Sequence, residues 1–205
     1  MNDRIEVVAT VLLSVAAVAT AWSSYQASRW NGEQAKAAST TNRLRIESTK
    51  AADLANAQTE IDVATFMQWI DAYALHRTEL ADFYIKRFRA EFKPAVNAWI
   101  ATRPLKNPDA PLTPFAMPEY KLAARAEASR LDAEAALSSA NVHRDIQRAT
   151  NYVLAVVMFA SALFFAGMST KLRLERARVA LLVIGCVIFL TGLIWIATSP
   201  ISVSV

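Results

Sequence analysis

Three long stretches of the chain carry no charged side chain, and they limit the fold more than any other feature. They cover residues 7–22, 151–170 and 179–205. A helix needs about 20 apolar residues to cross the hydrocarbon core of a membrane, and about 17–25 are tolerated. With their flanking residues, all three stretches meet that length. The sequence therefore predicts an all-α integral membrane protein with three membrane-spanning helices.

The residues between the first two spans are too polar for a membrane interior and hold most of the charge. This insert contains 17 Lys or Arg and 15 Asp or Glu residues, with the two signs interspersed. A balanced surface of this kind does not favour a nucleic-acid partner, despite the net charge of +4. The expected order is a first span at 1–24, the insert at 25–150, a second span at 151–170, a basic loop at 171–178, a third span at 179–199 and a tail at 200–205.

The first half of the insert favours a long helix. Between Tyr25 and Phe92 there is no proline, and Gly32 is the only glycine. Small residues recur at spacings of three and four, which predicts a coiled-coil-like stalk: Ala27, Trp30, Gln34, Ala37, Thr41, Leu44, Ser48, Ala51 and Ala55. The outgoing segment exceeds the returning one by about 35 residues. We therefore expect the outgoing helix to break, at Asn31-Gly32 or before Ile61.

Aromatic residues crowd the distal half of the insert and predict a compact helical head above the stalk. Six prolines between 94 and 118 exclude a regular helix across that segment. We interpret it as an apical loop that either covers the aromatic head or offers a docking surface. The residues expected to take part in protein–protein contacts are Trp69, Tyr73, Tyr84, Phe88, Phe92, Trp99 and Phe115.

A return helix is expected from about Glu119, with two stripes of apolar or small residues. One runs through Leu122, Ala126, Ser129, Ala133, Ala136, Ala140 and His143. The other runs through Leu131, Ala135, Ser138, Val142 and Ile146. We interpret the stripes as neighbours that together form a broad apolar face. Such a face could contact the outgoing helix and a second subunit, which predicts a homo-oligomer.

Short basic loops tend to stay in the cytoplasm, whereas long inserts cross a membrane largely regardless of charge. Four cations precede or begin the third span: Lys171, Arg173, Arg176 and Arg178. They predict a cytoplasmic loop and N-terminus, with the insert and the C-terminus on the other side, which in a bacterium is the periplasm. The inverted topology stays open as the alternative. The first span, whose n-region lacks a positive excess, is expected to be an uncleaved anchor.

No catalytic or metal-binding pattern is found, so we expect no enzymatic activity and no cofactor. His76 and His143 stand about 67 residues apart, and Cys186 lies within the third span. One functional hypothesis is a scaffold or accessory subunit whose insert binds a second copy or another envelope protein. The alternative is a homo-oligomeric pore. The polar residues that could line its path are Thr10, Ser14, Thr20 and Thr191.

The layout resembles an uncharacterised family of bacterial three-span membrane proteins, described only as a domain of unknown function. The resemblance is carried by a first span that runs into Trp22-Ser-Ser-Tyr25-Gln-Ala-Ser, by the Ala-rich helical insert, and by the closing two-span hairpin with its basic loop. It implies a location in the bacterial inner membrane. It implies no activity and no catalytic residue.

Overall fold

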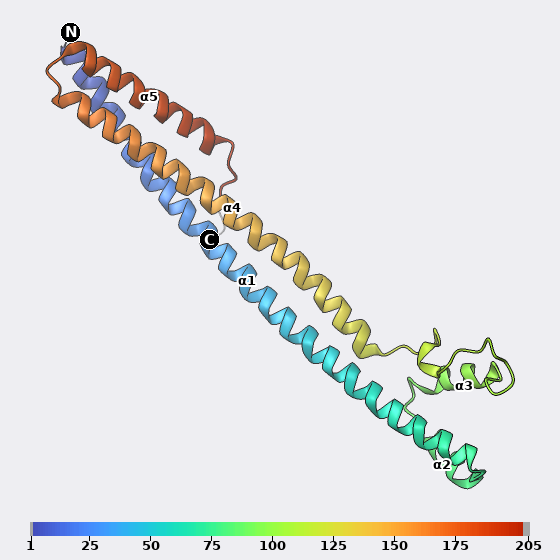
Figure 1. Cartoon of the computed structure of the whole chain (residues 1–205). Helices are drawn as coiled ribbons and strands as arrows, with labels where there is room; N and C mark the ends of the chain where they lie inside the picture. Colours follow the sequence, from blue (N-terminus) through green and yellow to red (C-terminus); the bar gives the residue numbers. More distant parts are fainter. Residues whose placement is uncertain (1, 203–205) are drawn as a thin grey trace. The chain divides into compact units, whose positions relative to one another are not determined.

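The computed structural model describes residues 2–202, with side chains from Ile5 onward, so residues 203–205 of the expected tail and the Arg4 side chain lie outside it. Throughout this range the regular structure is helical, and no strand occurs among these residues (Figure 1). The expected all-α class is confirmed. The helices are α1 (Asn2–Ala74), α2 (Thr78–Arg87), α3 (Lys93–Ala101), the 3-10 helix η1 (Pro114–Ala116), α4 (Ala123–Lys171) and α5 (Glu175–Ala197).

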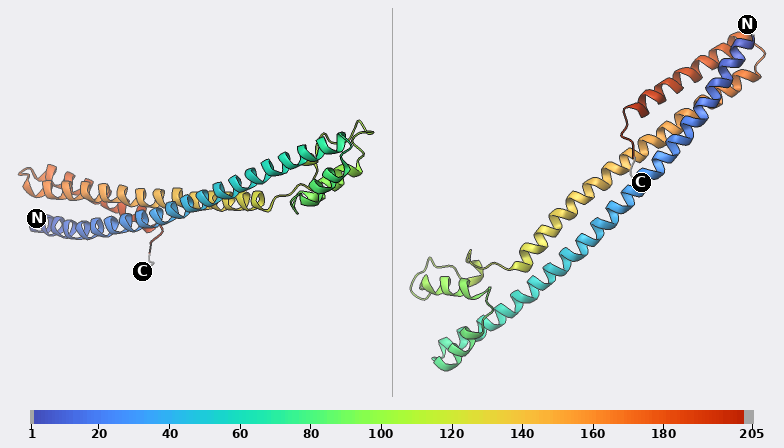
Figure 2. Two further views of the ribbon diagram at one scale, coloured as in Figure 1. Left: turned by 90° about the horizontal axis from the view of Figure 1, so that it is seen from below. Right: turned by 180° about the vertical axis from the view of Figure 1, so that it is seen from behind.

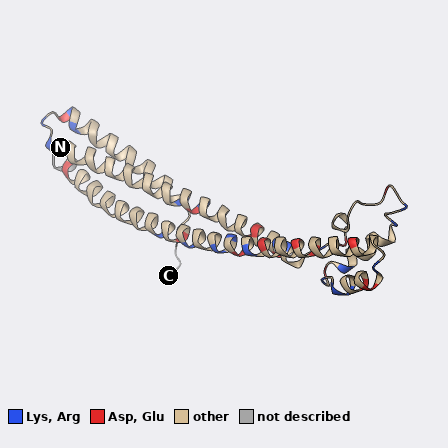
Figure 3. Ribbon diagram, turned by 60° about the horizontal axis from the view of Figure 1, so that its bottom comes forward, with Lys and Arg blue, Asp and Glu red and all other residues tan. Residues whose placement is uncertain are grey.

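Three of these helices are long and apolar enough to cross a membrane. They are α1, α4 and α5: α1 and α4 each contain a whole charge-free stretch of the sequence, and α5 contains the first part of the third stretch, residues 179–197. Figure 3 shows long uncharged segments on all three, with charged residues gathered beyond them. The three predicted spans are therefore confirmed by length and composition.

The chain divides into two compact units, which we describe separately. The first unit consists of Met1–Thr40 together with Leu137–Val205, and the second consists of Thr41–Ala136. In the first unit, α1, α4 and α5 lie side by side (Figure 2). The second unit contains the distal part of α1, the short helices α2, α3 and η1, and the start of α4.

The core of the first unit is built mainly from alanine, which lets helix backbones approach closely. Ala9 and Ala16 of α1 and Ala162 and Ala166 of α4 are completely buried. The one fully buried large side chain of this apolar core is Phe159 of α4, among the residues that the structure describes. Its ring centroid lies 5.5 Å from that of a phenylalanine on α5. Packing, rather than polar contact, therefore joins the apolar parts of these helices.

Two glycines of α5 provide the closest approach to α4. A Cβ added at Gly185 would lie 3.3 Å from the carbonyl oxygen of Ala162, and one at Gly192 would lie 2.8 Å from Cε1 of Phe159. The face of α4 that carries Ala162 and Ala166 thus contacts α5.

α1 contradicts the expected break of the outgoing helix. It continues without interruption through Gly32, where nothing lies within 4 Å of an added Cβ, and through Ile61 to Ala74. The chain turns instead at His76, which adopts a positive φ of 54°. The turn is closed by the Arg77 amide, which donates to the Ala72 carbonyl at 2.9 Å. Beyond Ala74 the chain folds back through α2 and α3.

In the second unit, α1 packs against the start of α4 along the small-residue seam. Leu44 of α1 forms a buried cluster with Leu131 and Ala135 of α4. Farther along, the Ser48 hydroxyl donates to the Ala128 carbonyl at 2.9 Å. Side chains as short as serine and alanine permit this direct bond between a hydroxyl and a neighbouring helix backbone. The buried area per residue is correspondingly small.

The proline-rich segment is partly helical, which corrects the expectation of an irregular loop from residue 94. α3 begins at Lys93 and carries Pro94 in its first turn, where the missing amide hydrogen costs nothing because that donor would be unpaired in any helix. Irregular chain follows from Thr102, with a positive φ of 53° at Arg103. The Trp99 indole then ties this chain back by donating to the Pro111 carbonyl at 2.6 Å.

The two stripes of the return helix lie on opposite faces, so the interpretation as one broad face was wrong. At about 100° per residue, Ala140 and Leu131 are about 180° apart. Leu131 and Ala135 are buried, whereas Ala133 and Ala140 are exposed. Within α4, the first stripe is exposed from Ala126 to His143, whereas the second packs within the chain at Leu131 and Ala135. The helix itself begins at Ala123 rather than near Glu119.

Candidate functional site

The residues expected to bind partners form the interior of the second unit. Trp69, Phe88, Phe92 and Trp99 are at most 7% exposed, and Phe115 and Tyr84 are partly buried against them. The rings of Phe92 and Phe115 are stacked with centroids 5.0 Å apart. Aromatic side chains bury the largest areas of any residue type. The aromatic residues thus stabilise the fold of the head, and of the seven only Tyr73, at 54%, is well exposed.

A buried carboxylate lies beside this aromatic cluster. The Asp62 side chain is completely buried, and its Oδ2 accepts hydrogen bonds from Arg89 Nη1 at 2.8 Å and from the Tyr120 hydroxyl at 3.1 Å. Its Oδ1 has no partner among the described residues, and neither does the buried Oε1 of Gln58 one turn earlier on α1. Asp62 is therefore only half satisfied, although a cation lies against it.

The electrostatics of this carboxylate follow from its burial. Desolvation raises the pKa of Asp62 above its ordinary value of 3.8, and the Arg89 guanidinium opposes that rise. Burial likewise raises the pKa of the Tyr120 phenol. The arrangement joins elements that are distant in sequence.

Arg89 connects Asp62 to the start of α4. It also pairs with Glu91, and the other oxygen of Glu91 accepts a hydrogen bond from the Ala123 amide at 3.0 Å. Ala123 is the first residue of α4, where backbone donors lack helical partners and a carboxylate is favoured. The network thus runs from α1 through the segment after α2 to α4. These residues were absent from the candidates drawn from the sequence.

The sequence did contain one signal for Asp62. Ala55, Thr59, Asp62, Phe66 and Trp69 follow one another at spacings of four and three, so Asp62 falls on the face of α1 that is buried. A carboxylate at such a position requires a partner. The identity of the partner could not be read from spacing, because Arg89 lies 27 residues away beyond a turn and a short helix.

The proposed pore residues show no arrangement of their own. Thr10 and Ser14 of α1 and Thr191 of α5 are exposed, and Thr20 is partly buried. Each hydroxyl donates to the backbone carbonyl four residues earlier on its own helix, at 2.7–3.0 Å. Because each hydroxyl proton is committed to the helix backbone, it is not available to donate to water in a pore. No observation in this chain therefore favours a hydrated path along them.

The basic residues predicted to set topology surround the connection between α4 and α5. Lys171 is the last residue of α4, Arg173 lies in the three-residue connection, and Arg176 and Arg178 lie in the first turn of α5. The connection is shorter than expected because both helices extend into the predicted loop. The positive charge is thus gathered at one end of the α4–α5 hairpin, where Glu175 is the only acidic residue of the segment.

At the other end of α5, the chain after the last helix is fixed to both longer helices. The Pro200 carbonyl accepts hydrogen bonds from Trp30 Nε1 and from the Tyr152 hydroxyl, each at 3.2 Å. The Ser202 amide donates to Gln26 Oε1 at 3.0 Å. Trp30 and Gln26 belong to α1 and Tyr152 to α4. This clamp therefore joins all three helices of the first unit where α5 ends.

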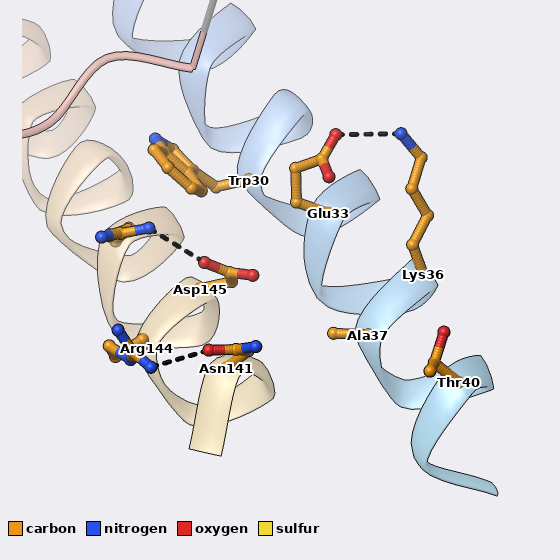
Figure 4. Close-up of a pocket in the computed structure, with 9 residues that line it drawn as sticks. Trp30, Glu33, Lys36, Ala37, Thr40, Asn141, Arg144 and Asp145 are labelled. Atoms are coloured by element: carbon orange, nitrogen blue, oxygen red, sulfur yellow. Dashed lines mark hydrogen bonds and ion pairs between the residues drawn. The ribbon is translucent and has the colours of Figure 1, made fainter. Parts of the chain in front are cut away.

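A polar groove lies between α1 and α4 next to this clamp (Figure 4). It has a volume of about 360 Å³. Arg148 pairs with Asp145 at 3.2 Å and stacks over Trp30, with its Cζ 4.5 Å from the ring centroid. Arg144 donates to the Asn141 side chain at 2.7 Å. The other residues that line the groove are Glu33, Lys36, Ala37 and Thr40.

Neither histidine belongs to a cluster of possible ligands. His76 and His143 are both exposed, and no group of three His, Cys, Asp or Glu side chains that could hold a metal occurs within residues 2–202.

Comparisons of the chain with protein-family models, with curated proteins and with solved structures found no match. The family resemblance therefore stays a prediction.

Proposed function

We propose that the protein is a multi-pass protein of the bacterial inner membrane, with its insert in the periplasm, that acts as a non-enzymatic scaffold. Its insert assembles with a second copy of the chain and offers the resulting surface to other envelope proteins. Membrane insertion is supported by the three long apolar helices. The orientation is supported by the basic end of the α4–α5 hairpin.

The observation that carries the proposed self-association is an exposed apolar seam on α1 in the second unit. Leu54 and Ile61 are each 54% exposed, and the exposed alanines Ala57 and Ala64 follow them at spacings of three and four. At about 100° per residue this seam faces away from the buried Ala55. Apolar residues at such spacing form the contact between paired helices, yet Leu54 and Ile61 stay more than half exposed among the described residues.

A second copy fits this seam for a geometric reason. Two copies inserted in one membrane with the same topology have parallel helices, so each residue of the seam can meet its own counterpart across a twofold axis. Leu54 and Ile61, with the small Ala57 between them, suit a contact in which each residue meets its own counterpart. The uncovered small-residue stripe on α4, through Ala133 and Ala140, offers a further face for close helix contact.

Cysteine cross-linking in native membranes tests the proposal. In a background that carries Cys186→Ser, we expect Ile61→Cys to form a disulfide-linked dimer on mild oxidation. Asn56→Cys is the matched control, because Asn56 is also exposed on α1 but lies about 140° away from Ile61 around the helix. Equal cross-linking at both positions, or no dimer at Ile61→Cys, would refute self-association through the seam. Cross-linking only to a different envelope protein would leave the scaffold and remove the second copy.

A further inference from the structure

We propose that the polar groove of the first unit binds the phosphate of a phospholipid headgroup, held by Arg148 and Arg144. The inference rests on the membrane placement proposed above and adds a ligand to it. The groove opens between α1 and α4 at the level where both helices leave their apolar segments. Three properties of the groove support a headgroup: its depth relative to the membrane, the charges that line it, and the fixed conformation of the Arg148 side chain.

The depth of Arg148 agrees with the position of lipid phosphate. Arg148 precedes Asn151, the first residue of the charge-free stretch on α4, by three residues, or about 4.5 Å along the helix. Arg144 lies about 10 Å before the same point. The headgroup layer of one leaflet is about 5–7 Å thick. Arg148 therefore lies within that layer, and Arg144 lies just beyond its outer edge, with its guanidinium on the water side.

The charges of the groove leave room for an anion. Lys36 pairs with Glu33 at 2.9 Å and Arg148 with Asp145. Arg144 forms no salt bridge with any carboxylate of the described residues, and its one recorded contact is with a neutral side chain. The lining thus contains three cations and two carboxylates. Arginine binds phosphate through two parallel hydrogen bonds, which makes these contacts both strong and directional.

Trp30 places Arg148 before any ligand arrives. The guanidinium lies over the indole ring, and the indole itself is fixed because its Nε1 donates to the Pro200 carbonyl. A cation held in this way loses little side-chain freedom on binding a phosphate. Tryptophan is also favoured at the boundary between headgroups and acyl chains. The end of the groove nearest the apolar segments is therefore fixed by contacts within the chain.

A lipid fits better than a free phosphate ion because apolar surface adjoins the groove. The groove lies next to the points where α1 and α4 enter their charge-free stretches, and acyl chains surround such stretches in a membrane. A phospholipid whose phosphate occupied the groove would place its acyl chains beside these stretches, whereas a free anion would gain nothing from them. The two sources of phosphate can thus be separated by experiment.

The test measures binding of phosphatidylglycerol to the full chain, purified in detergent and freed of lipid, by native mass spectrometry. Arg144→Gln should weaken binding about fivefold to tenfold, where tenfold is 1.4 kcal/mol. Arg148→Gln should weaken it at least as much. Arg125→Gln is the matched control, since Arg125 is an exposed arginine of α4 in the other unit, and it should leave binding unchanged. Because Arg144 contributes no ion pair, its variant is expected to fold normally.

Five results would overturn the inference. Unchanged binding in both groove variants would remove the site. Equal binding of diacylglycerol would show that acyl chains alone suffice, and full competition by inorganic phosphate at millimolar concentration would favour a free anion. Release of the protein from membranes by alkaline carbonate would overturn the membrane placement as well. If the unmodified protein stays in the membrane but does not distinguish phosphatidylglycerol from diacylglycerol, only the headgroup site is overturned.

Discussion

Replacement of Arg89 by methionine tests the buried network of the second unit most sharply. The substitution keeps much of the side-chain volume but removes the cation that faces the fully buried Asp62 carboxylate. A buried charge left without its partner costs about 3–5 kcal/mol. For a cooperative unit of 60–100 residues, 1 kcal/mol corresponds to about 4–8 °C. Arg89→Met should therefore lower the midpoint of thermal unfolding by at least about 12 °C at neutral pH.

Replacement of Asp62 by asparagine should cost much less, about 1 kcal/mol or below, on the order of one ordinary hydrogen bond. The amide oxygen can accept the bonds that Arg89 and Tyr120 now donate to Oδ2. The amide nitrogen takes the place of Oδ1, which has no described partner and lies one turn from the unpartnered oxygen of Gln58. The neutral side chain also avoids the desolvation of a charge.

The pH dependence gives an independent check. Burial raises the pKa of Asp62 above 3.8, so the folded state binds this proton more tightly than the unfolded state. Stability from this group is fully present below pH 3.8 and is lost as pH rises through the raised pKa. Because Arg89 lowers the pKa of Asp62, its removal raises that pKa further. The loss in Arg89→Met should therefore shrink as the pH falls toward 3.8.

The assay is thermal unfolding in detergent, followed by circular dichroism, with hydrogen exchange of α2 and α3 to locate the change in the second unit. The double variant Asp62→Asn/Arg89→Met should be more stable than Arg89→Met alone, because the carboxylate no longer has to be buried unpaired. Equal losses in the two single variants, or a larger loss in Asp62→Asn, would refute the reasoning.

Three further substitutions test the first unit by thermal unfolding. Gly32→Ala should raise the free energy of unfolding by about 0.5–1 kcal/mol, because α1 is continuous there and the site is open; a loss would indicate a hinge. Gly192→Ala should gain nothing or lose stability, because its Cβ would meet the Phe159 ring, and a gain equal to that of Gly32→Ala would contradict this packing. Tyr152→Phe removes a donor to the Pro200 carbonyl and should cost about 0.5–1.5 kcal/mol; faster protease cleavage of the tail would accompany the loss, and unchanged stability would show that the clamp contributes nothing.

The parts of the fold that could be predicted from sequence are those governed by local composition. The spans follow from uninterrupted apolar length, because a helix that crosses lipid must satisfy its backbone internally. The continuation of the first span into the insert follows from the absence of proline before Pro94. The uncovered face of α4 was also visible as a pattern, although its angle to the packed face was misjudged.

The parts that could not be predicted depend on tertiary contacts. The end of α1 at Ala74 has no proline or glycine to mark it, and His76 takes a positive φ, which is uncommon for any residue other than glycine. Pro94 was counted among the prolines that exclude a helix, yet it occupies the first turn of α3, where proline is acceptable. The aromatic residues were expected to build a compact head and, in addition, to contact partners, but which rings face inward could not be read from their number. Their rings fill the only large core of the second unit within the described residues.

The buried contact between α1 and α4 around Leu44 also has a consequence for synthesis of the chain on the ribosome. The Ser48 hydroxyl and the Ala128 carbonyl that it contacts are 80 residues apart. At about 5–20 residues per second, the ribosome needs about 4–16 s to add that length. During this interval the inner face of α1 has been synthesised but its partner has not. That face presents mainly alanine, serine and threonine around Leu44, so the nascent chain exposes little apolar surface before α4 is made. The small side chains that limit the strength of the contact between α1 and α4 therefore also limit aggregation of the nascent chain.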